Sequence, residues 1–300
     1  MCLQNKLVLK NIKIQGFYAG WLTENTGIDV LRIDELHPVV SGNKYFKLKY
    51  YLLDALQTGC HTVATFGGAY SNHIVAAAFA CREYGLNSVG IIRGQKPATP
   101  SHTLTQAEGY GMQLQFVSRA HFKNRQPLHQ SGNGVYFVGE GGYGALGAKG
   151  AAEILQCVPD SQYYTHIVCA LGTGTMFAGL VNGSSPHQTV IGISVLKNNF
   201  SIADEVKLLI NNNNSHGQYN IVHGNHFGGY AKHPPNLIGF MNELWTAHML
   251  PTDIVYTSKA FYALRQMVIE KLIDAGSRVL FVHSGGLQGN ASLPAGVLSY

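Results

Sequence analysis

The sequence carries little charge, and the charge that it has is dispersed. Asp, Glu, Lys and Arg make up 12% of its 300 residues, and the formal net charge is +5 with histidine neutral. A nucleic-acid-binding segment gathers its basic residues, whereas no run of five or more occurs here. We therefore expect a mildly basic protein without a nucleic-acid partner.

Cysteine is also scarce. The five cysteines lie far apart, their number is odd, and none forms a Cys-x-x-Cys pair. A disulfide framework or a structural zinc site needs paired, closely spaced cysteines. The segment His223-x-x-His226 offers two metal ligands, but the glycines and the asparagine around it favour packing or substrate contact. We expect no metal site.

Long apolar runs are missing as well. No stretch of 18 or more apolar residues occurs, and a helix that crosses a membrane needs about 20. The first 16 residues alternate polar and apolar types, so they lack the apolar core of a signal peptide. We expect no membrane partner and a cytoplasmic location.

Hydrophobic residues and glycines are abundant, at 46% and 35 residues, which suits an enzyme with tight loops around a large core. Short apolar runs alternate with longer amphipathic ones, and this alternation indicates parallel strands covered by helices. The predicted strands are 62–66, 87–93, 113–117, 135–138, 166–171, 189–195 and 278–283. The predicted helices are 71–84, 102–109, 145–157, 175–181, 202–210, 237–248 and 258–275.

The alternation restarts near residue 150, which predicts two sheets. The predicted fold class is α/β, with two domains that are each an open twisted sheet with helices on both faces. The smaller domain would comprise residues 57–150. The larger would combine residues 151–300 with residues 1–56, because we expect the first strands to join the second sheet.

The first candidate site segment is Ser41-Gly-Asn-Lys44. A Gly-Asn pair marks a tight turn, and the residues after it have helical character, so Lys44 would lie near a helix start. The field at a helix start disfavours a cation and lowers the pKa of an amine, and Schiff-base chemistry needs a free amine. The alternative is an ordinary surface lysine, because Gly-Asn-Lys alone is a weak pattern.

The second segment runs from Phe66 to His73 and leads from a strand through two glycines into a helix. Ser71 would stand at the helix start, where backbone N–H groups can bind a carboxylate or a phosphate. Its hydroxyl would either contact a ligand or cap the helix. His73 is open to a packing role as well as a catalytic one.

The third segment, Gly172-Thr-Gly174-Thr175, joins an apolar strand to a helix and predicts a phosphate site. The rival is a dinucleotide fingerprint, as in a nucleotide-binding oxidoreductase. That fingerprint needs a third glycine where Phe177 stands and an acidic residue at the end of the next strand. The next strand leads instead into Lys197, so a single phosphate fits better.

The fourth segment, His283-Ser284-Gly-Gly, ends the last apolar strand. Open α/β sheets bind ligands in the crevice at the carboxyl ends of their strands, so the hydroxyl of Ser284 would point into that crevice. Taken alone, this segment indicates only a turn.

Together and in this order, the four segments resemble those of fold-type II pyridoxal-phosphate (PLP) enzymes. More narrowly, they resemble the 1-aminocyclopropane-1-carboxylate (ACC) deaminase and D-cysteine desulfhydrase family, from about Leu31 to Gly286. The resemblance implies a two-domain fold of the tryptophan synthase beta type, PLP as cofactor in the larger domain, and a small amino acid as substrate. We also expect a homodimer.

The resemblance assigns a role to each matching residue. Lys44 would form the Schiff base and move the α-proton of the substrate, and Asn72 and Ser284 would contact the cofactor ring. The expected catalytic residues are Lys44, Ser71, Tyr230 and Tyr256. The expected cofactor contacts are Lys44, Asn72, Gly172, Thr173, Gly174, Thr175 and Ser284. The expected substrate contacts are Ser71, Asn72 and His73.

Three positions favour the desulfhydrase branch. The resemblance implies that the deaminase has Gln, Glu and Leu where this sequence has His73, Thr257 and Ser284. A serine beside the pyridine nitrogen also favours elimination over transamination. The leading hypothesis is α,β-elimination from D-cysteine to pyruvate, ammonia and sulfide. The alternatives are ACC deamination, a related lyase reaction on another β-substituted amino acid, and a non-catalytic binding protein.

Overall fold

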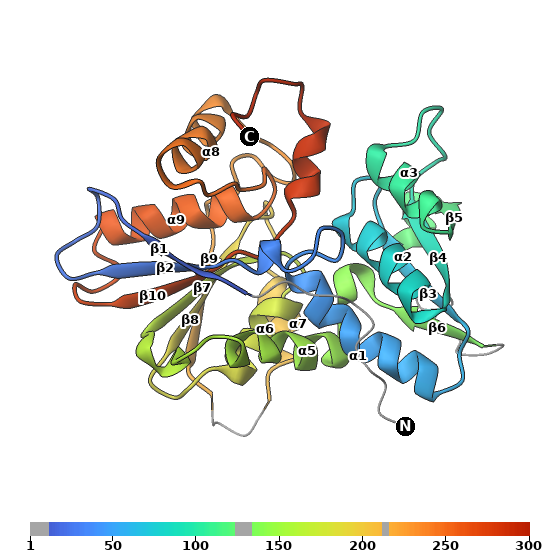
Figure 1. The fold of residues 1–300 in the computed structure, drawn as a ribbon, viewed down its shortest axis with the longest axis horizontal. Coiled ribbons are helices and arrows are strands. Elements are labelled where there is room, and N and C mark those ends of the chain that lie inside the picture. Colours follow the sequence, from blue (N-terminus) through green and yellow to red (C-terminus); the bar gives the residue numbers. More distant parts are fainter. Residues whose placement is uncertain (1–11, 124–133, 212–215) are drawn as a thin grey trace.

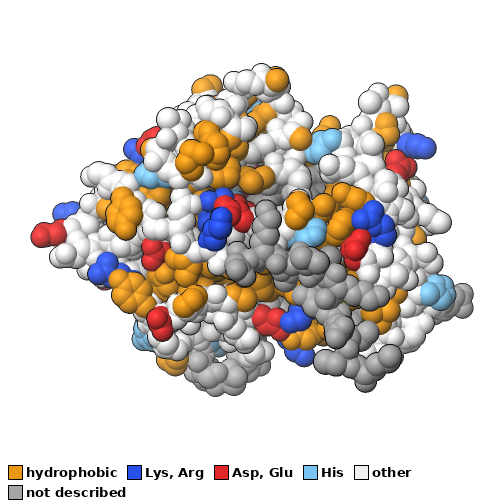
Figure 2. All heavy atoms as spheres, in the orientation of Figure 1, with side chains coloured by type: hydrophobic (Ala, Val, Ile, Leu, Met, Phe, Trp, Pro, Cys, Tyr) orange, Lys and Arg blue, Asp and Glu red, His pale blue; other side chains and the backbone are white. Residues whose placement is uncertain are grey.

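The computed structural model describes residues 12–123, 134–211 and 216–300. The ribbon has two lobes, each built around one sheet, so the expectation of two sheets is confirmed (Figure 1). The surface in Figure 2 is mostly uncharged, with small, separate groups of acidic and basic side chains, as the low charge content requires. In the described part of the chain, no helix is both long enough and apolar enough to cross a bilayer.

The larger sheet has six strands in the order β1-β2-β10-β7-β8-β9. Their bounds are β1 Ile14–Phe17, β2 Gly27–Leu31, β7 His166–Leu171, β8 Thr189–Ser194, β9 Gln218–Val222 and β10 Arg278–Val282. All neighbours pair in parallel except β1 and β2, which are antiparallel. The prediction of a wholly parallel sheet is wrong at this edge, because a short connection can join only antiparallel neighbours.

The smaller sheet has four parallel strands in the order β5-β4-β3-β6. Their bounds are β3 Thr62–Gly67, β4 Asn87–Arg93, β5 Met112–Val117 and β6 Val135–Val138. All four lie inside the predicted smaller domain, 57–150. In the larger sheet, the central strand β7 is covered on both faces, which explains why it is apolar from Ile167 to Leu171.

Helices cover both faces of the larger sheet, with α8 and α9 on one side and α5 and α6 on the other (Figure 1). The α-helices are α1 Asn43–Gln57, α2 Asn72–Tyr84, α3 His102–Gly109, α4 Arg119–Lys123, α5 Ala145–Gln156, α6 Thr175–Gly183, α7 Ile202–Lys207, α8 Pro235–His248 and α9 Thr257–Ile269. The short 3-10 helices are η1 Ile33–Glu35, η3 Glu140–Gly142, η4 Ser161–Tyr163 and η5 Leu287–Ser292.

Helix α5 packs between α1 and α6, on the side of the larger sheet. A Cβ atom at Gly150 would lie 1.9 Å from the carbonyl oxygen of Phe46, and one at Gly179 would lie 2.5 Å from the Cβ of Ala151. Glycine at both positions therefore lets the three helices approach closely. The predicted domain boundary at 150 falls inside α5, and the division itself stays a prediction.

Helix ends are the main departure from the predicted elements. Helix α9 stops at Ile269, although the sequence suggested helix to residue 275. Lys271 adopts a left-handed conformation (φ +57°), and the amide of Leu272 bonds back to the carbonyl of Met267. This is a Schellman-type ending, which hydrophobic spacing does not reveal because it depends on one backbone angle.

Candidate active site

A cavity of about 680 Å³ lies between the two lobes, at the carboxyl ends of their parallel strands. Gly68 follows β3, Gly172 follows β7, and Ser284 closely follows β10, and all three line it. The edge where parallel strands end is the usual ligand site of open α/β sheets. Ten of the eleven predicted site residues line this cavity, and the eleventh, Thr175, is buried. The ten are Lys44, Ser71, Asn72, His73, Gly172, Thr173, Gly174, Tyr230, Tyr256 and Ser284.

Lys44 is the second residue of α1, so the expected helix start is confirmed. Gly42 precedes it at φ +61°, and a Cβ atom there would lie 2.0 Å from the carbonyl oxygen of Ser284. The Lys44 amine donates to the side-chain oxygen of Asn43 at 2.8 Å. Burial lowers the pKa of Lys44 to about 8, against an opposing effect of the Asp253 carboxylate. The direction agrees with the sequence-based expectation, but burial is the main cause.

This lowered pKa gives a prediction for the rate at which the apoprotein captures an aldehyde. The neutral amine is the nucleophile, and its fraction rises as the pH rises through the pKa of Lys44. We expect the rate of PLP capture to rise between pH 7 and 9 and to level off above the pKa of about 8. Stopped-flow absorbance would measure it. A rate that keeps rising to pH 10 would indicate an ordinary lysine pKa.

Lys47 lies one helical turn after Lys44 and is buried. Its amine donates to the carbonyl of Gly141 at 2.9 Å and to the hydroxyl of Thr173 at 3.4 Å. Burial lowers its pKa well below the usual value, and the neighbouring charge of Lys44 lowers it further. Sequence reasoning gave Lys47 no role, although the spacing of three residues from Lys44 on one helix was a usable signal.

The glycine loop ends β7 and leads into α6, whose N-cap residue is Gly174 at φ +78°. A Cβ atom at Gly172 would lie 3.0 Å from the ring of Tyr256, and one at Gly174 would lie 2.6 Å from Val206. The loop thus presents backbone and the positive end of a helix to the cavity, with the Lys47 amine beside Thr173. An anion the size of a phosphate suits this corner.

Ser71 occupies the N-cap position of α2, but its side chain makes no capping hydrogen bond. The capping alternative is therefore wrong, and the hydroxyl lines the cavity. The amide nitrogen of Asn72 donates weakly to the carbonyl of Gly286 at 3.3 Å, while its side-chain oxygen is buried without a partner among the described residues. Such an orphaned amide oxygen is costly unless a ligand or water reaches it.

His73 is buried, and its Nε2 lies 2.8 Å from the hydroxyl of Thr65. That hydroxyl donates to the carbonyl of Val138, so it accepts from an Nε2–H group of His73. Burial, reinforced by the charges of Lys44 and Lys47, lowers the pKa of His73 well below its usual value. A neutral imidazole with this bond is a poor proton donor to a substrate.

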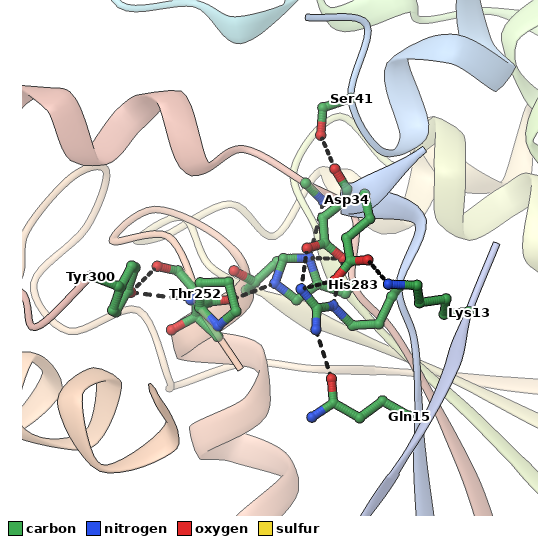
Figure 3. Close-up of polar contacts among 12 residues, drawn as sticks. Lys13, Gln15, Asp34, Ser41, Thr252, His283 and Tyr300 are labelled. Atoms are coloured by element: carbon green, nitrogen blue, oxygen red, sulfur yellow. Dashed lines mark hydrogen bonds and ion pairs between the residues drawn. The ribbon is translucent and has the colours of Figure 1, made fainter. Parts of the chain in front are cut away.

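His283, the residue before Ser284, is held by a buried polar network (Figure 3). Arg32 donates to both carboxylate oxygens of Asp34, at 2.9 and 2.8 Å, and Asp34 lies 3.2 Å from Nδ1 of His283. His283 also donates from Nε2 to the carbonyl of Pro251 at 2.7 Å. Ser41 donates to the backbone carbonyl of Asp34 at 2.9 Å. The network thus joins the segments that carry Lys44 and Ser284.

Tyr256 and Tyr230 line one wall of the cavity. Burial raises the pKa of Tyr256, and the neighbouring Tyr230 and Asp253 raise it further, so its phenol stays protonated. Asp253 is fully buried and accepts from the amides of Val255, Tyr256 and Thr257, which fixes the start of α9. Sequence reasoning missed Asp253 because its role depends on backbone amides that the pattern does not show.

Thr257 does not line the cavity. It is fully buried, and its hydroxyl lies 2.6 Å from the Asp253 carboxylate, to which it donates. The side chain that follows Tyr256 therefore offers no acid or base to a ligand in the cavity.

These residues fit pyridoxal phosphate. The buried amine of Lys44, with its lowered pKa, can react with the aldehyde of the cofactor. The start of α6 with Lys47 beside it suits the phosphate. The buried side-chain oxygen of Asn72 has no partner among the described residues and can accept from the cofactor. Ser284 presents a hydroxyl rather than a carboxylate on the opposite wall. The cavity is also large enough for the cofactor and a small amino acid together.

Comparisons with known proteins agree. The family model described as pyridoxal-phosphate dependent enzyme matches residues 17–285. A Thermotoga maritima protein provisionally named ACC deaminase is 31% identical, over 94% of this chain and 96% of its own length. The Arabidopsis thaliana bifunctional D-cysteine desulfhydrase/ACC deaminase is 27% identical, over 89% of this chain and 74% of its own length.

The fold agrees as well. A crystal structure of an ACC deaminase homologue superposes with a TM-score of 0.78 at 24% identity, covering 94% of this chain and 91% of that chain. Fold and site together define a PLP-dependent enzyme of fold type II. The chain belongs to the pyridoxal-phosphate-dependent enzyme family, among relatives named ACC deaminase and D-cysteine desulfhydrase.

Proposed function

We propose that the protein catalyses α,β-elimination from a small amino acid, with D-cysteine as the favoured substrate. D-cysteine and water would give pyruvate, ammonia and hydrogen sulfide. The observation that carries this choice is the position of Thr257, whose hydroxyl is bonded to Asp253 and turned away from the cavity. Ring opening of ACC has no α-hydrogen to remove and needs a further acid or nucleophile, which Thr257 does not offer.

The chain's own residues supply the binding and the proton transfers. Bound PLP stabilises the electron pair left when the bond from Cα to hydrogen breaks. Lys44 Nζ would hold the cofactor aldehyde, and as a free amine it would take the α-proton of the substrate. The Ser71 hydroxyl and the backbone N–H groups at the start of α2 bind the substrate carboxylate. His73 would contact the substrate carboxylate through its backbone N–H group, because its Nε2 is already hydrogen-bonded to Thr65.

The same proposal assigns the remaining contacts. Gly172, Thr173, Gly174 and the amide of Thr175 would hold the phosphate together with Lys47, and Asn72 and Ser284 would contact the ring. Tyr256 keeps its proton because burial raises its pKa, so its phenol would donate a hydrogen bond to the departing thiolate. Tyr230 stands beside it and would orient the same group.

A substrate panel tests the proposal. Release of 2-oxo acid and ammonia would be measured from D-cysteine, L-cysteine, D-serine, cysteate and ACC. We expect kcat/KM for D-cysteine to exceed that for ACC by at least about tenfold, the size of effect that one or two site contacts produce. Turnover of ACC without turnover of any β-substituted amino acid would contradict it.

ACC deamination is the second candidate, and the name of the Thermotoga maritima relative favours it. Elimination from another β-substituted amino acid is a third. The homodimer and the cytoplasmic location remain predictions, and the oligomeric state can be measured by light scattering on the purified holoenzyme.

A further inference from the structure

Lys259 is a fully buried lysine on α9 that the proposed chemistry does not use. Among the ion pairs of the described residues, none involves it. Its amine donates to two backbone carbonyls, at 3.0 Å to His226 and 2.7 Å to Gly229. Burial lowers its pKa to about 8, and the Asp253 carboxylate opposes that shift. Burying an amine is unfavourable, so this placement calls for a compensating role.

The two carbonyls belong to consecutive turns of one loop. The amide of Gly229 bonds back to the carbonyl of His226, and the amide of Lys232 bonds back to the carbonyl of Gly229. Each carbonyl that accepts from Lys259 is thus also the acceptor that closes a turn. One side chain therefore ties both turns to α9.

The loop that these two turns form, residues 226–232, has an unfavourable backbone conformation. Phe227, Gly228, Gly229 and Ala231 all have positive φ angles, of +50°, +91°, +121° and +53°. Left-handed conformations are unfavourable for a residue with a side chain, so Phe227 and Ala231 need an outside constraint to hold them. Besides Lys259, α9 supplies that constraint through Tyr262, whose ring lies 5.0 Å from that of Phe227.

Tyr230 stands in the middle of this constrained loop. Its side chain lines the cavity, yet it is 51% exposed, so little packing fixes its position. Tyr256, its neighbour in the same wall of the cavity, is the N-cap residue of α9 and lies three residues before Lys259. Lys259 is thus placed to fix the position of Tyr230 relative to Tyr256.

We propose that Lys259 is a positioning residue that clamps the 226–232 loop to α9 and so holds Tyr230 beside Tyr256 over the reaction cavity. The catalytic part of this inference rests on the proposed function. The clamp itself can be tested without any turnover.

The test is Lys259→Met, which keeps the length and volume of the side chain but removes the donors. Both carbonyls keep their backbone bonds, so we expect the variant to fold. Hydrogen exchange of the amides in 226–232 should rise by about tenfold or more, because the loop loses two hydrogen bonds from a charged donor. Lys207→Met, at an exposed lysine on α7, is the matched control and should leave the loop unchanged.

A double-mutant cycle tests the link to Tyr230. Lys259→Met and Tyr230→Phe should each lower kcat/KM for the amino acid that the panel identifies, and the double variant should lose little beyond the larger single effect. The inference would be overturned if the losses of kcat/KM in the two single variants added up in the double variant. It would also be overturned if a folded Lys259→Met variant showed unchanged hydrogen exchange in residues 226–232. Lys259→Gln, which keeps amide donors, replaces Lys259→Met if the latter does not fold. If no amino acid is turned over, the proposed function fails. Hydrogen exchange of the 226–232 loop still tests whether Lys259 holds the loop to α9.

Discussion

Lys44→Ala should lower kcat for the amino-acid substrate by at least about 10³-fold, within the range that a positioned acid–base group contributes. The variant loses both the nucleophile that binds the cofactor aldehyde and the amine that moves the α-proton. Borohydride reduction followed by peptide mapping should also find no pyridoxyl label in the α1 peptide. A parental circular dichroism spectrum of the variant would separate loss of covalent capture from loss of folding.

Lys49→Ala is the matched control for this substitution. Lys49 lies on the same helix, but its amine pairs with Glu153 of α5, and Lys49 does not line the cavity. It should keep parental activity and a full pyridoxyl label at Lys44. A label on Lys47, Lys49 or Lys259 in the parent protein would show that Lys44 is not the cofactor lysine.

Gly174→Asp should weaken PLP binding by about 100-fold, which corresponds to about 2.7 kcal/mol. The new Cβ atom would lie 2.6 Å from Val206, so the loop would have to shift. Its carboxylate would also bring a negative charge to the helix end that we assign to the phosphate. Absorbance titration of the apoprotein with PLP would measure the change.

Gly59→Asp controls for the backbone strain. Gly59 has φ +72°, close to the +78° of Gly174, and a side chain there would meet nothing within 4 Å. Its affinity for PLP should equal that of the parent. Unchanged affinity in a folded Gly174→Asp variant would remove the glycine loop from the phosphate site.

The sequence predicted the fold well where the spacing of hydrophobic residues and the positions of glycine turns indicated the same element boundaries. Strand β7 and helix α6 were both expected, because an apolar run leads through glycines into a helix. Strands β1, β2 and β9 were not given bounds. Strand β1 is an edge strand of four residues, of which only Phe17 is buried, so it carries little hydrophobic pattern. It pairs with β2, and β2 in turn pairs with β10 far along the chain.

The site was predictable only where a residue type signals its chemistry locally. Lys44, Ser71 and the glycine loop lie at element boundaries that the sequence marks, and they line one cavity. Lys259 looked like an ordinary helix lysine, because its acceptors are backbone carbonyls about 30 residues earlier. Asp253 was missed for the same reason, since the amides that it accepts from carry no sequence signature.

The pairing of β2 with β10 has a consequence for biosynthesis. Gly27 lies opposite Arg278, so the larger sheet cannot close until some 250 further residues have left the ribosome. At about 5–20 residues per second, this delay lasts roughly 10–50 s. The smaller sheet, whose strands are neighbours in sequence, can form during that interval. Lys44 meets the segment that carries Ser284 only at the end, so the nascent chain acquires its cofactor pocket as the last step of folding.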